Sequence, residues 1–135
     1  MVDHAPLILV GYNGTPHGDR ALAYAVGQAT RMGAELLLMV AGEDPALWPT
    51  HAARRTRRIR ALLARAEEQL AGLGTRWRLG ISDAEPTQAL SDSAHRYHAD
   101  LIVVGSSGKG WHRLFSDRVG CSLARTTHTP FLIAP

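Results

Sequence analysis

The 135-residue chain has a single cysteine, only seven prolines and no long apolar run. Its one cysteine, Cys121, cannot form a disulfide within the chain, which suits a reducing compartment. No segment approaches the roughly 18 consecutive apolar residues of a membrane span. The first residues also lack the basic region and cleavage site of a secretory signal. We therefore expect a cytoplasmic protein without membrane contact, folded as one domain over residues 1–135 because this length suits a single core.

The net charge of +3 is unevenly distributed. Residues 1–50 sum to −3, residues 51–80 to +6 and residues 81–135 to zero. The basic segment places six arginines along one predicted helix: Arg54, Arg55, Arg57, Arg58, Arg60 and Arg65. They lack a recognition motif and aromatic interleaving, so the pattern favours a solvated helix face over a nucleic-acid patch. Nucleic acid is therefore not an expected partner, and the role of the segment stays open.

Short apolar runs alternate with helix-spaced apolar residues along the whole chain. Strands are predicted at 7–10, 36–40, 76–81, 101–104 and 131–134, and helices around 21–29, 59–70, 86–97 and 119–124. Continuous apolar runs are typical of strands buried on both faces. The alternating order and the length of the connections predict an α/β fold with a doubly wound parallel sheet.

Two segments that follow predicted strands are rich in glycine: Gly11–Gly18 and Gly105–Gly110. If the first and fourth strands are neighbours, both segments face the crevice where open α/β sheets bind ligands. Bare backbone N–H groups beside Lys109 could form a nest for phosphate. The spacing matches neither a P-loop nor the dinucleotide fingerprint. A tight turn that binds nothing explains the glycines equally well.

The whole chain resembles the universal stress protein family. The resemblance rests on three stretches in the right order: Leu7–Pro16, Ala99–Gly108 and Thr129–Pro135. It implies a five-stranded parallel sheet of order 3-2-1-4-5 with helices on both faces. It also implies a homodimer, often through the last strand, here Pro130–Ala134.

One branch of this family binds ATP through Gly-x-x-Gly, nine residues, and then Gly followed by Ser or Thr. Gly105 and Gly108 match the first pair. Asn13 takes the place of an aspartate, and Val40 matches a valine that lies against adenine. Asp117 and Arg118 stand where the branch has Gly-Ser, and the carboxylate of Asp117 would repel phosphates unless Arg118 offsets it. A shifted match at Gly120–Ser122 would leave too short a last helix and is disfavoured.

The resemblance implies a stress-response protein that binds ATP, with Mg²⁺ as an accompanying ion. The alternative is a stress protein without nucleotide that acts through dimerisation and protein partners. Catalytic residues and a metal site are not predicted, so at most slow ATP hydrolysis is expected. The residues assigned to the nucleotide site are Gly11, Tyr12, Asn13, Val40, Val104, Gly105, Ser106, Gly108, Lys109, Asp117, Arg118 and Val119.

Overall fold

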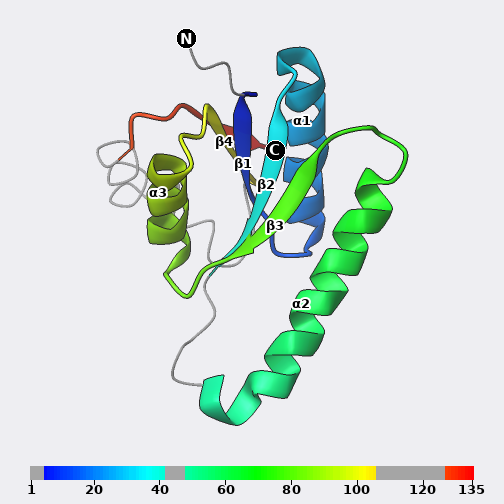
Figure 1. The fold of residues 1–135 in the computed structure, drawn as a ribbon, viewed down its shortest axis with the longest axis vertical. Helices are drawn as coiled ribbons and strands as arrows, with labels where there is room; N and C mark the ends of the chain where they lie inside the picture. The colour runs from blue at the N-terminus through cyan, green and yellow to red at the C-terminus, as the bar shows by residue number, and fades with distance from the viewer. Residues whose placement is uncertain (1–4, 42–47, 106–126) are drawn as a thin grey trace.

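The computed structural model describes residues 5–41, 48–105 and 127–135. Its centre is a five-stranded parallel sheet in the order β3-β2-β1-β4-β5 (Figure 1). The strands are β1 (Leu7–Gly11), β2 (Glu35–Val40), β3 (Trp77–Ile81), β4 (Leu101–Gly105) and β5 (Phe131–Ala134). The described helices are α1 (Pro16–Met32), α2 (Trp48–Leu70) and α3 (Pro86–Arg96). The predicted α/β fold and strand order are confirmed, whereas the helix predicted around 119–124 lies outside the described residues.

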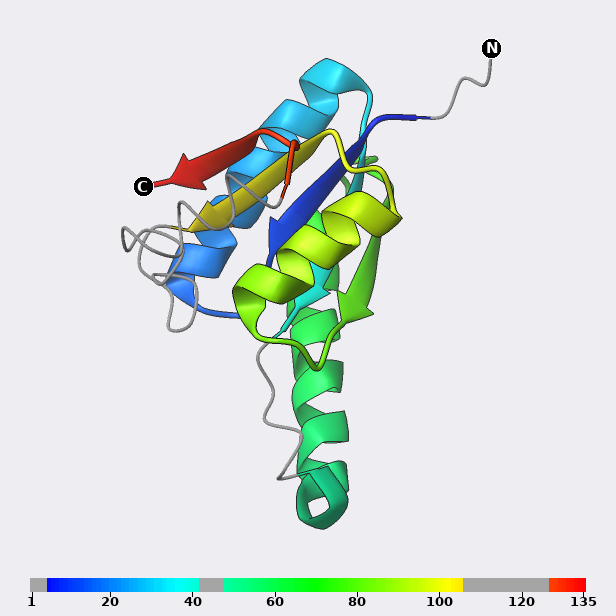
Figure 2. The same cartoon turned by 90° about the vertical axis from the view of Figure 1, so that its left-hand side faces the viewer.

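The helices cover both faces of the sheet (Figures 1 and 2). On one face, α1 and α2 pack on every second residue of the central strands, such as Ile8, Val10 and Leu38. On the other face, Ala89 and Leu90 of α3 pack on the intervening residues of the same strands. Because both faces are covered, all five residues of β1 are buried, which explains why this strand is a continuous apolar run.

Local signals fix the ends of α1. Thr15 is its N-cap, with a side-chain oxygen that accepts a hydrogen bond from the Gly18 N–H at 3.2 Å. Pro16 follows at the first helical position, where its missing N–H costs nothing. Gly33 ends the helix in the left-handed conformation at φ 66°, which glycine adopts without strain. The start of α1 is therefore set directly after the end of β1.

The helix α2 is much longer than its apolar stripe predicts. Its buried residues Leu62, Ala66 and Leu70 all lie in its second half, where it packs on the sheet. The first half continues back to Trp48 and extends past the carboxyl ends of the strands (Figure 2). Among the described helices, none is both long and apolar enough to cross a bilayer.

Candidate functional site

The crevice lies between the carboxyl ends of β1 and β4, where the strand order reverses. These strands pair directly, with Val10 opposite Val103, so the prediction that they are neighbours is confirmed. The chain leaves β1 toward α1 and β2 on one side, and β4 leads toward β5 on the other. The segments that follow β1 and β4 therefore begin side by side.

Gly105 brings the end of β4 against the first turn of α1. A Cβ atom placed on Gly105 would lie 2.6 Å from the carbonyl oxygen of His17 and 3.0 Å from its carbonyl carbon. Both contacts are to backbone, which cannot turn aside as a flexible side chain could. Only glycine permits this approach, and Gly105 is itself buried at the end of β4.

Asn13 organises the segment between β1 and α1. Its Oδ1 accepts hydrogen bonds from the backbone N–H of Thr15 at 3.1 Å and from the Thr15 hydroxyl at 2.6 Å. Gly18 lies directly against the same oxygen. A Cβ atom placed on Gly18 would be 2.5 Å from it, so a larger residue would not fit there. With Oδ1 held by these donors, the half-buried side chain retains its amide NH₂ group as a hydrogen-bond donor. An aspartate would offer a carboxylate oxygen there instead.

We expect Asn13→Ala to lower the free energy of unfolding by about 1 kcal/mol, since it removes the acceptor for both Thr15 donors. Asn13→Asp is the matched control, because it keeps an acceptor oxygen and adds a negative charge near the start of α1. Its stability should equal or exceed that of the native chain. Urea unfolding followed by circular dichroism measures both. Equal losses in the two variants would contradict this role for Oδ1.

Three of the predicted site residues have side chains that face the core. Tyr12 is 0% exposed, and Val40 and Val104 are each 1% exposed. Tyr12 and Val40 pack in the core under α1 and α2, whereas Val104 packs on the α3 side. A ligand at the strand ends would therefore meet the backbone of these residues.

A hydrogen-bonded group links this edge to α2. Tyr12 donates from its hydroxyl to Gln69 at 3.3 Å, and Arg65 donates from Nε to Asp19 Oδ1 at 3.1 Å. Burial raises the pKa of the Tyr12 phenol, and the charge of Asp19 adds to that shift. The hydrogen bond to Asp19 and its charge raise the pKa of Arg65. The Asp19 carboxylate near the crevice is thus paired with a cation.

The structure describes half of the predicted site residues: Gly11, Tyr12, Asn13, Val40, Val104 and Gly105. The others lie outside the described residues: Ser106, Gly108, Lys109, Asp117, Arg118 and Val119. Within the described part, the sequence analysis missed the contact of His17 with Gly105 and the pair Asp19–Arg65. The pair joins residues 46 positions apart, and no sequence pattern indicates it.

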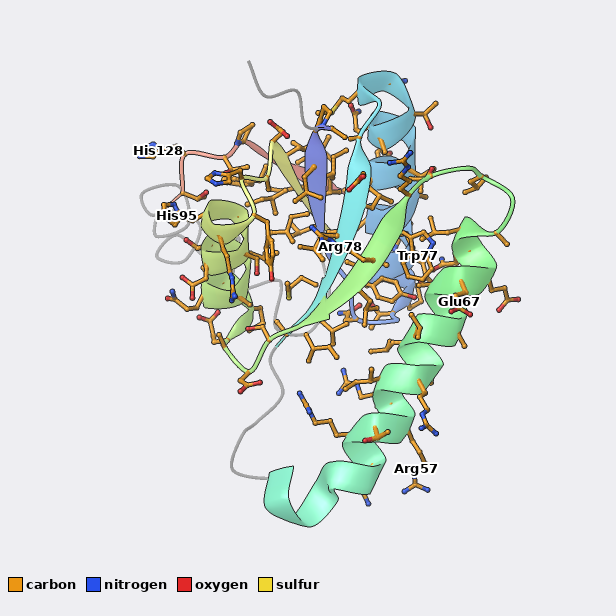
Figure 3. All side chains as sticks on the ribbon, in the orientation of Figure 1. Arg57, Glu67, Trp77, Arg78, His95 and His128 are labelled. Carbon is orange, nitrogen blue, oxygen red and sulfur yellow. The ribbon has the colours of Figure 1, made fainter. Side chains whose placement is uncertain are left out.

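Three histidines lie at the opposite end of the sheet. His95, His98 and His128 line an open cavity of about 400 Å³ with Asp100, and Figure 3 shows His95 and His128 on the same side of the molecule. His95 lies in the last turn of α3, which ends at Arg96, whereas His98 has a φ of 53° and lies outside the helix. No three His, Cys, Asp or Glu residues of the described chain form a metal-binding group.

The strand order agrees with the resemblance to the universal stress protein family, and comparison with known proteins shows whether the chain belongs to that family. The sequence profile of the universal stress protein family matches residues 6–135. The chain belongs to the universal stress protein family.

Individual members of the family are similar over most of this chain. A universal stress protein from Mycolicibacterium smegmatis is 29% identical over 136 residues, which cover 93% of this chain. The chain spans 44% of the length of that relative. A crystal structure of a universal stress protein in complex with cAMP is 27% identical, covers 98% of both chains and has a TM-score of 0.71.

A third protein shares the fold at lower identity. The universal stress protein from Archaeoglobus fulgidus in complex with dAMP is 16% identical, covers 98% of both chains and has a TM-score of 0.71. Members of this family with the same sheet therefore bind adenine nucleotides.

Proposed function

We propose that this chain binds an adenine nucleotide, with ATP as the expected ligand and Mg²⁺ as its accompanying ion, in the crevice between β1 and β4. The observation that carries the proposal is the approach of Gly105 to the His17 carbonyl, which brings the end of β4 against the start of α1 at the point where the strand order reverses. The cAMP and dAMP complexes of related proteins support adenine as the base.

The described residues offer complementary chemistry to such a ligand. The dipole of α1 favours negative charge near its start, and the Asn13 amide is a hydrogen-bond donor there. The backbone at Gly11, Tyr12, Val40 and Val104 forms the strand ends on which base and ribose would lie. Ser106, Gly108, Lys109, Asp117, Arg118 and Val119 are proposed to hold the phosphates.

A thermal-shift panel with ATP, ADP, AMP and cAMP tests the proposal, each with and without Mg²⁺. Ligand at 100 times its Kd stabilises a protein by about 2.7 kcal/mol, so a tight ligand should raise the melting temperature by several degrees. Gly108→Val should abolish the shift. If no nucleotide at millimolar concentration changes the melting temperature of the native chain, the proposal is wrong.

A second set of variants tests the predicted effect of Asp117 and Arg118. If these residues stand where ATP-binding relatives have Gly-Ser, Asp117→Gly with Arg118→Ser should tighten ATP binding, because a carboxylate near phosphates is removed. Isothermal titration calorimetry measures the change in Kd. An unchanged Kd would contradict this sequence alignment but would not contradict ATP as the proposed ligand.

The alternative function, action through dimerisation and protein partners, is favoured by one feature of the sheet. β5 lies at its edge, and Ile133 on this strand is 44% exposed. An edge strand of the described sheet with an exposed apolar residue is suited to pairing with a second copy, so we also propose a homodimer through Pro130–Ala134. A cytoplasmic location is proposed with it, from the single cysteine of the chain. Sedimentation of Ile133→Lys against the native chain tests the interface.

A further inference from the structure

The first half of α2 extends beyond the rest of the molecule. At 1.5 Å per residue its 23 residues span about 34 Å, whereas the six residues of β2 span about 20 Å. The excess lies at the carboxyl-end edge of the sheet, the edge of the crevice (Figures 1 and 2). None of residues 54–61 is buried. This half of the helix is therefore accessible from most directions.

The accessible half carries positive charge that the described chain does not neutralise. Arg54, Arg57 and Arg60 are exposed, and the structure gives them no carboxylate partner among the described residues. Figure 3 shows Arg57 directed away from the sheet. The sequence has no aspartate or glutamate between Trp48 and Ala66. Two other arginines of α2 have acidic partners: Arg55 lies 4.0 Å from the Asp83 carboxylate, and Arg65 in the packed half pairs with Asp19.

This arrangement works against the stability of the isolated helix. Arg54, Arg57 and Arg60 follow one another at intervals of three residues, the spacing at which like charges on a helix repel. The first turn of α2 has no acidic residue to offset its dipole. The sequence pattern favours a solvated face, and nucleic acid is not an expected partner from it. The structure adds that Arg54, Arg57 and Arg60 are exposed without a carboxylate partner among the described residues, which favours a partner that supplies negative charge.

From this arrangement we infer that the protruding half of α2 binds the phosphate backbone of double-stranded DNA, without sequence preference. Each guanidinium can donate two parallel hydrogen bonds to a phosphate. A helix about 10–12 Å across fits a major groove about 12 Å wide. Contacts to phosphate carry no sequence information, so binding through Arg54, Arg57 and Arg60 would be independent of sequence.

Other anionic partners fit this surface less well. An anionic bilayer would require an apolar face in the protruding half, but Ile59 there is partly covered and its neighbours are arginines. An acidic protein would require a buried apolar anchor, and residues 54–61 include none of the large exposed apolar side chains of the described chain. The surface of residues 54–61 offers positive charge and hydrogen-bond donors, as a phosphate backbone requires.

Fluorescence anisotropy with a labelled 30-base-pair duplex of arbitrary sequence tests the inference. If three phosphates are contacted, the affinity should fall roughly 40-fold between 50 and 200 mM salt, since the logarithmic slope is about 0.9 per contact. In Arg57→Gln with Arg60→Gln, one contact remains and the fall should be roughly threefold. A second duplex of unrelated sequence should bind the native chain equally.

Arg31→Gln with Arg96→Gln is the matched control, because it removes the same charge from exposed sites on α1 and α3. It should leave the salt dependence at the native value. The inference is overturned if the native chain does not bind the duplex, or if both double variants lose affinity equally. It is also overturned if phosphatidylserine vesicles or polyglutamate bind more tightly than DNA. The nucleotide panel on Arg57→Gln with Arg60→Gln should match the native result, so the two proposals can fail separately.

Discussion

Gly105→Ala is expected to lower the free energy of unfolding by about 2 kcal/mol, the typical cost of forcing an extra carbon into a packed region. The added Cβ would lie 2.6 Å from the His17 carbonyl oxygen, so the end of β4 and the first turn of α1 would have to separate. The same separation should weaken nucleotide binding, because it displaces the backbone that forms the mouth of the crevice. Chemical denaturation and calorimetry measure the two effects.

Gly27→Ala is the matched control for Gly105→Ala. Gly27 lies within α1, and a Cβ placed on it meets no atom within 4 Å. Alanine there should stabilise the chain by about 0.5–1 kcal/mol through its higher helix propensity, with nucleotide binding unchanged. If Gly105→Ala matched Gly27→Ala in both stability and binding, the close approach to His17 would have no part in the site.

Tyr12→Ala is expected to cost about 3–5 kcal/mol, as for other large aromatic side chains removed from a core. Tyr12 is 0% exposed and packs with Leu62 and Ala66 of α2, so its removal leaves a cavity between that helix and the sheet. Tyr12→Phe keeps the ring and loses only the 3.3 Å hydrogen bond to Gln69. Its cost should be about 1 kcal/mol. Equal losses in the two variants would show that the hydroxyl, not the packing, stabilises this contact.

The pH dependence gives a second readout for the same residue. Burial raises the pKa of Tyr12 in the folded chain above the unfolded value of about 10. The folded state therefore disfavours ionised Tyr12, and its contribution to stability is complete below pH 10 and is lost as the pH rises toward the folded pKa. Unfolding free energies measured between pH 8 and 11 should fall less steeply in Tyr12→Phe than in the native chain.

The strands could be predicted from the sequence because burial on both faces leaves an unmistakable pattern. Leu7–Val10 and Leu36–Val40 are continuous apolar runs, and both are buried in the structure. The start of α2 could not be predicted in the same way. Periodicity marks only the residues that pack on a core, and none of residues 54–61, the part of the protruding half whose burial the structure describes, is buried.

The candidate site was predictable in its location but not in its contacts. The glycines after β1 and β4 indicate polar segments at neighbouring strand ends. That Gly105 meets the His17 carbonyl, and that Asn13 binds Thr15, depends on the angle at which α1 leaves β1. The pair Asp19–Arg65 depends on where α2 crosses the sheet. Such geometry is set by packing, and residue spacing does not contain it.

An NMR titration of the ¹⁵N-labelled chain with ATP and Mg²⁺ tests the nucleotide site most directly. Backbone amides in Gly11–Gly18 and at Val40, Val104 and Gly105 should shift together and saturate along one binding curve. Amides around His95 and His128, at the opposite end of the sheet, should stay unchanged. Shifts confined to that opposite end, or none at millimolar ATP, would contradict a nucleotide site between β1 and β4.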